Sequence, residues 1–182
     1  MDKNLFIKEA SFKELDAIMD IICEARETIR SLGIDQWQDG YPQREIIEND
    51  IKTGVSFCIE NKESGEVLAT VCVFESGEPL YDKIYDGEWL TGKSPSELLD
   101  KTNYTAVHRV AISVRARGQG LSTAIIDFVA QKARKIGKRS IRIDTHEGNV
   151  VMRKMLEKHG FVHCGTIFLE SGDSRVAYEK VL

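Results

Sequence analysis

The feature that most constrains the fold is a strand, a turn rich in arginine and glycine, a helix and a second strand, which follow one another within residues 105–146. An apolar run over 104–114 predicts the first strand. Apolar residues at helical spacing predict a helix over 121–136, which Gly137 ends. The run at 140–146 predicts the second strand. Two strands joined through a helix in this way run parallel with a right-handed crossover, which places the chain in the mixed α/β class.

The remaining apolar patterns extend this unit to the order β-α-α-β-β-β-α-β-α-β-β. They predict further strands at 5–10, 55–61, 66–75, 161–169 and 175–182, and further helices at 11–32, 42–52 and 149–159. A Ser11–Glu14 capping box opens the first helix, and Gly33 ends it. No internal repeat or linker divides the chain, so its 182 residues are expected to form a single domain with a mixed sheet.

One stretch departs from this regular pattern. Residues 76–103 contain Pro79, Pro95 and an acidic, aromatic segment at 81–89, and only 94–99 favour a short helix. A loop of this length in a compact domain is usually functional or mobile. We refer to residues 76–103 as the insertion.

Charge is distributed unevenly along the chain. Residues 101–142 carry ten Lys and Arg against one acidic residue, whereas residues 1–100 carry ten against twenty-two. Such asymmetry suggests an anionic partner for the middle segment and a cationic one for the first half. The alternative is that the acidic residues simply cover solvated helix faces.

Composition excludes several classes of protein. Three prolines, fourteen glycines and no low-complexity tract argue against a disordered or fibrous chain. No apolar run approaches the ~20 residues needed to span a bilayer. The first residues also lack the apolar region of a signal peptide. We therefore expect a soluble protein with a cytoplasmic location.

The cysteines and histidines do not indicate a metal site. Cys23, Cys58, Cys72 and Cys164 show no CxxC spacing, and no HExxH pair is present. Each cysteine has apolar neighbours in sequence, so we expect buried, reduced thiols and no structural metal.

The turn RARGQGLS at 115–122 has the character of an anion-binding loop. Its glycines let successive backbone N–H groups point outward beside the positive end of a helix dipole, and Arg115 and Arg117 add charge. A P-loop is excluded because its lysine is missing. The dinucleotide motif GxGxxG fails because Thr123 occupies the third glycine position. A plain strand–helix turn that binds nothing is the alternative.

Residues 104–182 resemble the core of the GNAT N-acetyltransferases. The resemblance rests on the order of RGQGLS and IRIDTHEGNVVMRKMLEKHGF (141–161), which look like the family's cofactor loop and its strand–Asn–helix–GF segment. The family loop reads [RQ]-x-x-G-x-[GA]. A register starting at Arg115 fits it, and a register starting at Arg117 lies at the usual distance after the strand. We prefer the second, which puts Ser122 where the family has Gly or Ala.

The resemblance implies a GNAT-like domain with acetyl-CoA as co-substrate and no metal. Backbone groups of Val110 and Ile112 would bind the pantetheine arm. The pyrophosphate would lie on the loop formed by Arg117, Gly118, Gln119, Gly120, Leu121 and Ser122. Residues 104–182 would form the cofactor core, and residues 1–103 the acceptor side. The implied reaction moves acetyl to a primary amine of a small molecule or peptide N-terminus, directly and in a ternary complex.

Acetylation of an alkylammonium at neutral pH needs a base, directly or through water. Asp144 lies five residues before Asn149, where some members of the family carry a catalytic Glu. The alternative is that Asp144 pairs with Arg142, which shares its strand face, or with another arginine, and only positions the cleft. His108 is the rival base, because its ordinary pKa of about 6.5 suits the task.

Asn149 has two possible roles. The resemblance implies a contact with the pantetheine or acetyl amide, but capping the following helix would by itself account for the residue. Seven residues later, where members of the family often carry a Tyr that acts as general acid on the thiolate, the chain has Leu156. Protonation of the thiolate would then fall to water, to a hydroxyl such as Tyr104 or Tyr178, or to no acid.

The acceptor side is expected to use aromatic residues. Trp37, Tyr41 and Trp89 lie beside acidic residues in the first half of the chain, a combination that suits an amine through cation–π contact. They would equally serve to plug the edge of the core.

We expect a monomer or homodimer without a membrane partner. A nucleic-acid partner is not expected either, since Phe128 is the only aromatic residue of the basic 115–142 segment. A catalytically silent acyl-CoA-binding module is the alternative function.

Overall fold

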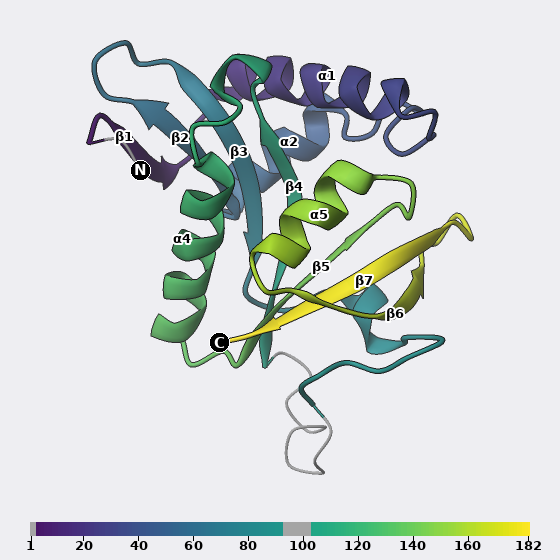
Figure 1. Ribbon diagram of the computed structural model, residues 1–182. Coiled ribbons are helices and arrows are strands. Elements are labelled where there is room, and N and C mark those ends of the chain that lie inside the picture. The colour runs from purple at the N-terminus through teal and green to yellow at the C-terminus, as the bar shows by residue number, and fades with distance from the viewer. Residues whose placement is uncertain (1–2, 93–102) are drawn as a thin grey trace. The chain divides into compact units, whose positions relative to one another are not determined.

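A computed structural model describes residues 3–92 and 103–182, and its elements follow the order predicted from the sequence (Figure 1). The strands are β1 (Leu5–Glu9), β2 (Ser56–Asn61), β3 (Val67–Phe74), β4 (Tyr104–Ile112), β5 (Ser140–Thr145), β6 (Val162–Phe168) and β7 (Ser174–Val181). The helices are α1 (Leu15–Ser31), α2 (Arg44–Lys52), α4 (Leu121–Lys135) and α5 (Val150–Lys158), with 3-10 turns η1 (Pro79–Asp82) and η2 (Val114–Ala116). The short helix expected at 94–99 lies outside the described residues.

The strands form one mixed sheet in the order β1-β2-β3-β4-β5-β7-β6. Antiparallel pairing joins β1 to β2, β2 to β3, β5 to β7 and β6 to β7. β4 and β5 pair in parallel, with Tyr104 opposite Ser140 and Ala106 opposite Arg142. The parallel strand–helix–strand unit and the mixed α/β class predicted from the sequence are therefore confirmed.

The chain divides into two compact units, and the boundaries fall at the end of β3 and inside β4 and α4. Unit 1 comprises Met1–Val73 and Arg109–Ile125, and unit 2 comprises Phe74–His108 and Ile126–Leu182. The contacts join the insertion and the first part of β4 to the C-terminal strands.

The core of unit 1 forms under α1 and α2, the purple and blue helices of Figure 1. Leu15, Ile18 and Ile22 recur at helical spacing on α1 and are buried. At the start of the helix, Glu14 Oε2 accepts hydrogen bonds from the backbone N–H of Ser11 (2.9 Å) and from its hydroxyl (2.7 Å). The expected Ser11–Glu14 contact therefore forms, but α1 begins at Leu15 with Glu14 as its N-cap, so the contact closes the turn before the helix and does not cap it.

One expectation about the cysteines is wrong. Cys58, Cys72 and Cys164 are buried and reduced, but Cys23 is exposed. It follows Ile22 of the buried face by one residue, and one residue turns a helix by about 100°. Apolar sequence neighbours therefore do not bury Cys23.

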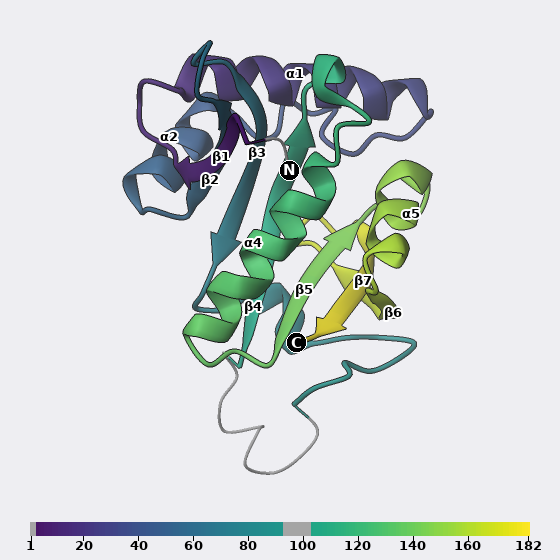
Figure 2. The same cartoon turned by 60° about the vertical axis from the view of Figure 1, so that its left-hand side comes forward.

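The core of unit 2 combines the insertion with strands of the C-terminal part of the chain. It contains Tyr81, Trp89, Tyr104, Ala106, Cys164, Ile167 and Ala177. Helix α5 lies beside β5 and β7 in both ribbon views (Figures 1 and 2). Helix α5, which Asn149 was expected to open, therefore lies against β5, the strand that carries Asp144.

The described part of the insertion, residues 76–92, packs tightly on β6. Tyr85 and Thr166 exchange two backbone hydrogen bonds of 2.8 Å. A Cβ added at Gly87 would lie 1.9 Å from the carbonyl oxygen of Cys164, and one added at Gly165 would lie 2.5 Å from that of Tyr85. The two backbones therefore touch where glycine alone fits.

Candidate active site

The turn between β4 and α4 is an exposed loop with two left-handed glycines. Residues 117–120 are exposed, and α4 begins at the buried Leu121. Gly118 has φ 78° and Gly120 φ 76°, and a Cβ at either position would meet nothing within 4 Å. Conformation rather than crowding thus requires glycine. An open loop that leads into a helix N-terminus is suited to an anion such as a pyrophosphate.

Side chains of unit 1 hold this loop in place. Glu24 Oε2 accepts the backbone N–H of Val114 (2.8 Å), and Arg117 Nη2 donates to the hydroxyl of Thr28 (2.7 Å). Both partners come from α1. The sequence-predicted site residues Arg117, Gly118, Gln119 and Gly120 are therefore brought together on a loop that α1 supports, while Ser122 lies half-buried in the first turn of α4.

Arg109 marks an irregularity in β4, beside the predicted pantetheine-binding residues. It has φ 53° within the strand, and Val110 and Ile112, both half-buried, follow it. Its guanidinium contacts Asp50 of α2 through Nε–Oδ2 (2.7 Å) and Nη2–Oδ1 (2.9 Å). Burial opposes the charge, but Cys72, Tyr41 and Asp50 outweigh it and raise the pKa of Arg109. The strained position is thus held by a buried ion pair.

Two of the predicted acceptor residues lie near one another in the loop before α2. The ring centroids of Trp37 and Tyr41 are 6.4 Å apart, and both residues are half-buried. The Tyr41 hydroxyl accepts a hydrogen bond from Arg109 Nη1 (2.6 Å). Burial raises the pKa of Tyr41, although Arg109 opposes this effect. Arg26 donates to the backbone carbonyls of residues 40–42 and so fixes the loop.

The two candidate bases lie in unit 2, and both are close to Tyr81. The Tyr81 hydroxyl donates to Asp144 Oδ1 (2.6 Å), and the Tyr81 ring lies 6.0 Å from the ring of His108. His108 Nε2 is 3.1 Å from Glu78 Oε2, within ion-pair distance but without hydrogen-bond alignment. Burial, followed by the charge of Asp144, raises the pKa of Tyr81 well above its ordinary value. Tyr81 therefore stays protonated and donates.

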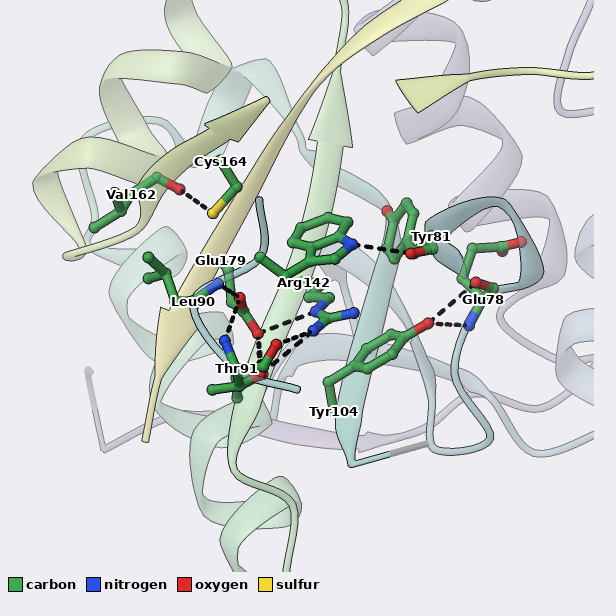
Figure 3. A network of polar contacts seen from close by, with 11 residues as sticks. Glu78, Tyr81, Leu90, Thr91, Tyr104, Arg142, Val162, Cys164 and Glu179 are labelled. Atoms are coloured by element: carbon green, nitrogen blue, oxygen red, sulfur yellow. Dashed lines mark hydrogen bonds and ion pairs between the residues drawn. The ribbon is translucent and has the colours of Figure 1, made fainter. Parts of the chain in front are cut away.

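Asp144 is not paired with Arg142, its neighbour on the same strand face. Arg142 Nε donates instead to Glu179 Oε1 (3.0 Å) and Nη2 to the Thr91 carbonyl (3.1 Å), as Figure 3 shows. Glu179 is fully buried and also accepts from the Thr91 and Ser140 hydroxyls. The carboxylate of Asp144 is therefore not neutralised by an ion pair with Arg142.

Trp89, the third predicted acceptor residue, lies in the core of unit 2. Its indole N–H donates to the carbonyl of Tyr81 (2.9 Å), and the Arg142 guanidinium stacks 4.2 Å from its ring centroid. On the other side, the same guanidinium lies 4.1 Å from the ring of Tyr104. This arrangement is the one expected of a residue that plugs the edge of the core, the alternative to an acceptor contact.

Comparison with known proteins now identifies the family. The acetyltransferase (GNAT) family model matches residues 15–161. The chain belongs to the GNAT acetyltransferase family. A GNAT acetyltransferase from Streptococcus agalactiae is 36% identical, with a TM-score of 0.83 over 99% of this chain and 96% of that one. Two further solved structures share the fold. A GNAT acetyltransferase from Listeria monocytogenes is 20% identical, with a TM-score of 0.71 over 98% of this chain and 95% of that one. A GCN5-related N-acetyltransferase from Kribbella flavida is 17% identical, with a TM-score of 0.65 over 100% of both chains. No protein with a curated description matches the sequence significantly.

Two GNAT positions on α5 have clear structural roles. Asn149 is the N-cap of the helix, and its side-chain oxygen accepts the backbone N–H of Met152 (3.2 Å). Leu156, where relatives often carry a tyrosine, is fully buried. The two hydroxyls weighed as substitutes are engaged elsewhere. Tyr104 bonds to the backbone of Glu78, and Tyr178 bonds to Arg153.

The tyrosine at Asp144 is the residue that the sequence did not reveal. Tyr81 and Asp144 are 63 residues apart, and Tyr81 sits in η1, an element with no periodic pattern. The acidic, aromatic character of 81–89 was the only available signal, and it indicated an acceptor site instead.

The loop geometry fits the co-substrate of the GNAT family. Family members use acetyl-CoA, and the exposed, glycine-containing 117–120 loop at the start of α4 presents the surface that its pyrophosphate needs. Over residues 3–92 and 103–182, His, Cys, Asp and Glu form no group of three that would hold a metal ion. In the same ranges, no helix is both long enough and apolar enough to cross a bilayer.

Proposed function

We propose that the protein is an N-acetyltransferase that moves the acetyl group of acetyl-CoA to a primary amine. The observation that carries the proposal is the loop at 117–120, which is open, exposed and turned by two left-handed glycines into the N-terminus of α4. Membership of the GNAT acetyltransferase family supports it.

Cofactor binding is assigned to unit 1. Backbone N–H groups from Gly118 to Ser122 hold the pyrophosphate, because the helix dipole and the loop favour a negative charge there. Backbone groups of Val110 and Ile112 on β4 hold the pantetheine arm. Arg109, the preceding residue of β4, is held by its ion pair with Asp50 of α2.

Proton removal is assigned to unit 2. When the amine forms its bond to the acetyl carbon, it loses a proton and the sulfur of CoA takes the electron pair of the broken C–S bond. Asp144 accepts the proton directly or through water, and His108 is the second candidate. Both are half-buried residues beside Tyr81, and a base within reach contributes typically 10²–10⁴-fold to such reactions.

We expect direct transfer, without acetylation of Cys58, Cys72 or Cys164. Burial raises the pKa of the Cys58 and Cys164 thiols to about 11 and that of Cys72 to about 12. Thiols with such pKa values are almost entirely protonated at neutral pH and are poor nucleophiles.

The acceptor is an amine of a small molecule or peptide N-terminus, and Trp37 and Tyr41 are its proposed contacts. Trp89 is not retained in this role, because the Arg142 guanidinium already stacks on its ring. A cationic amine suits the acidic first half of the chain.

Thiol release tests the function. Purified protein is incubated with acetyl-CoA and a panel of polyamines, amino acids, aminoglycosides and peptides with free N-termini, and free CoA thiol is measured. Amine-dependent release, with an acetylated product in the mass spectrum, supports the proposal. Tight CoA binding by calorimetry without release from any amine would instead identify a silent acyl-CoA-binding module.

A further inference from the structure

We propose that Tyr81 is the positioning residue of the catalytic base: its hydroxyl orients Asp144 and leaves one carboxylate oxygen to accept the proton of the amine. The inference rests on the proposed acetyl transfer and deepens it, because it assigns the base to Asp144 rather than His108. It also gives the insertion a role in catalysis.

The first observation is the contact itself. The Tyr81 hydroxyl donates to Asp144 Oδ1 at 2.6 Å, a length typical of an O–H group bonded to a charged oxygen. Within residues 3–92 and 103–182, Asp144 Oδ2 has no hydrogen-bond partner, and the residue is only half-buried. The contact therefore fixes the carboxylate and leaves its second oxygen accessible.

The second observation is that Tyr81 is buried and contacted closely by its neighbours. Only 1% of its surface is exposed. The ring centroid of Trp89 lies 5.3 Å away and that of Tyr104 6.1 Å away. The Tyr81 backbone N–H donates to the Glu78 carbonyl (2.9 Å), and its own carbonyl accepts from Trp89. A ring held on both sides keeps its hydroxyl at one place.

The third observation is that the strand bearing Asp144 also anchors the segment bearing Tyr81. Arg142, two residues before Asp144 on β5, stacks on Trp89 and bonds to Thr91. Glu179 on β7 binds the same guanidinium and the backbone N–H of Thr91 (Figure 3). The insertion is therefore attached to β5, the strand that carries Asp144. This attachment helps to hold Tyr81 at hydrogen-bond distance from Asp144.

His108 lacks a comparable arrangement. Its Nε2 is buried and lies near Glu78, and its ring packs edge-on against Phe74 at 5.3 Å. An imidazole beside a carboxylate and two rings serves as a wall of the Tyr81 site. A base needs an atom that is free to take up the proton. Asp144 is half-buried and is bonded to Tyr81 through Oδ1 alone, whereas His108 Nε2 is buried.

The test begins with Tyr81→Phe, which removes one oxygen and keeps the ring. Turnover with the best amine is expected to fall by roughly tenfold to a hundredfold, the factor to which a hydrogen bond to a charged group corresponds. The affinity for CoA is expected to stay unchanged. Tyr85→Phe is the matched control, because this phenol lies in the same insertion, stacks on Phe168 and is 37% exposed. It should keep full turnover.

A double-mutant cycle separates positioning from a structural role. If Tyr81 acts through Asp144, then Tyr81→Phe causes no further loss of turnover in an Asp144→Asn background. An equal loss in both backgrounds overturns the proposal, as does a Tyr81→Phe protein with turnover within twofold of wild type.

A spectroscopic measurement makes the contact testable without activity. In wild-type protein, burial protects the Tyr81 hydroxyl proton from exchange with solvent. Its hydrogen bond to a carboxylate is expected to place its resonance at low field in the proton NMR spectrum. Asp144→Asn should move it upfield. Absence of such a resonance overturns the proposal even if Tyr81→Phe does not fold. A wild-type protein with the resonance but without amine-dependent thiol release contradicts the proposed function instead.

Discussion

Arg109 and Asp50 form a two-point ion pair between β4 and α2, at a strand residue with left-handed φ. Their side chains are 9% and 4% exposed, so bulk water hydrates neither charge to any large extent. Removing one partner of such a pair is costly because the other charge is left buried.

We therefore predict that Asp50→Ala lowers the free energy of unfolding by about 3–5 kcal/mol. Urea unfolding followed by circular dichroism measures it. Asp16→Ala is the matched control: Asp16 also pairs with an arginine, Arg44, but is 85% exposed, and no measurable change is expected. Equal effects of the two substitutions would contradict the structural role of the Asp50 pair.

Gly120→Glu is predicted to abolish CoA binding. A side chain at φ 76° strains the loop, and its carboxylate adds negative charge where the pyrophosphate is expected. Isothermal titration calorimetry with CoA measures the affinity. Gly172→Glu introduces the same side chain at φ 91° in the exposed β6–β7 turn, and it should bind CoA normally. Unchanged affinity in Gly120→Glu would remove the loop assignment.

Asp144→Asn is predicted to lower turnover about 10²–10⁴-fold while CoA affinity stays close to wild type, because the amide keeps the shape but accepts no proton. Steady-state thiol release and calorimetry give the two quantities. His108→Gln, made in parallel, should have the smaller effect on turnover. The reverse order of the two variants would assign the base to His108.

Thiol labelling should separate Cys23 from the other cysteines. At pH 8 a thiol reagent is expected to modify one of the four thiols rapidly in the native protein and all four in denaturant. Burial raises the pKa of Cys58, Cys72 and Cys164 to about 11, 12 and 11, so their thiolate fractions are small at that pH. Cys23→Ser should remove the fast reaction and leave turnover intact, whereas loss of turnover would argue against direct transfer.

Local pattern was enough to predict most of the fold. Apolar spacing, glycine stops and the Ser11–Glu14 box predicted the order of strands and helices, because these signals act over a few residues. The exposed loop at 117–120 was also predictable, since it depends on glycines within one turn.

Pairings distant in sequence were not predictable. Tyr81 meets Asp144 across 63 residues, and Arg109 meets Asp50 across 59. Nothing in the local pattern selects either partner. Arg142 illustrates the same limit, because the adjacent Asp144 was the obvious candidate and the buried Glu179 is the actual one. Tertiary packing made these choices.

The backbone contact of Tyr85–Gly87 with β6 has a consequence for solubility. β6 is the last strand of the sheet, and such a strand offers unpaired N–H and C=O groups to any other chain. Tyr85 occupies the groups of Thr166, and Gly87 presses against the carbonyl of Cys164. The insertion that supports Asp144 thereby also shields the middle of this edge against intermolecular strand pairing.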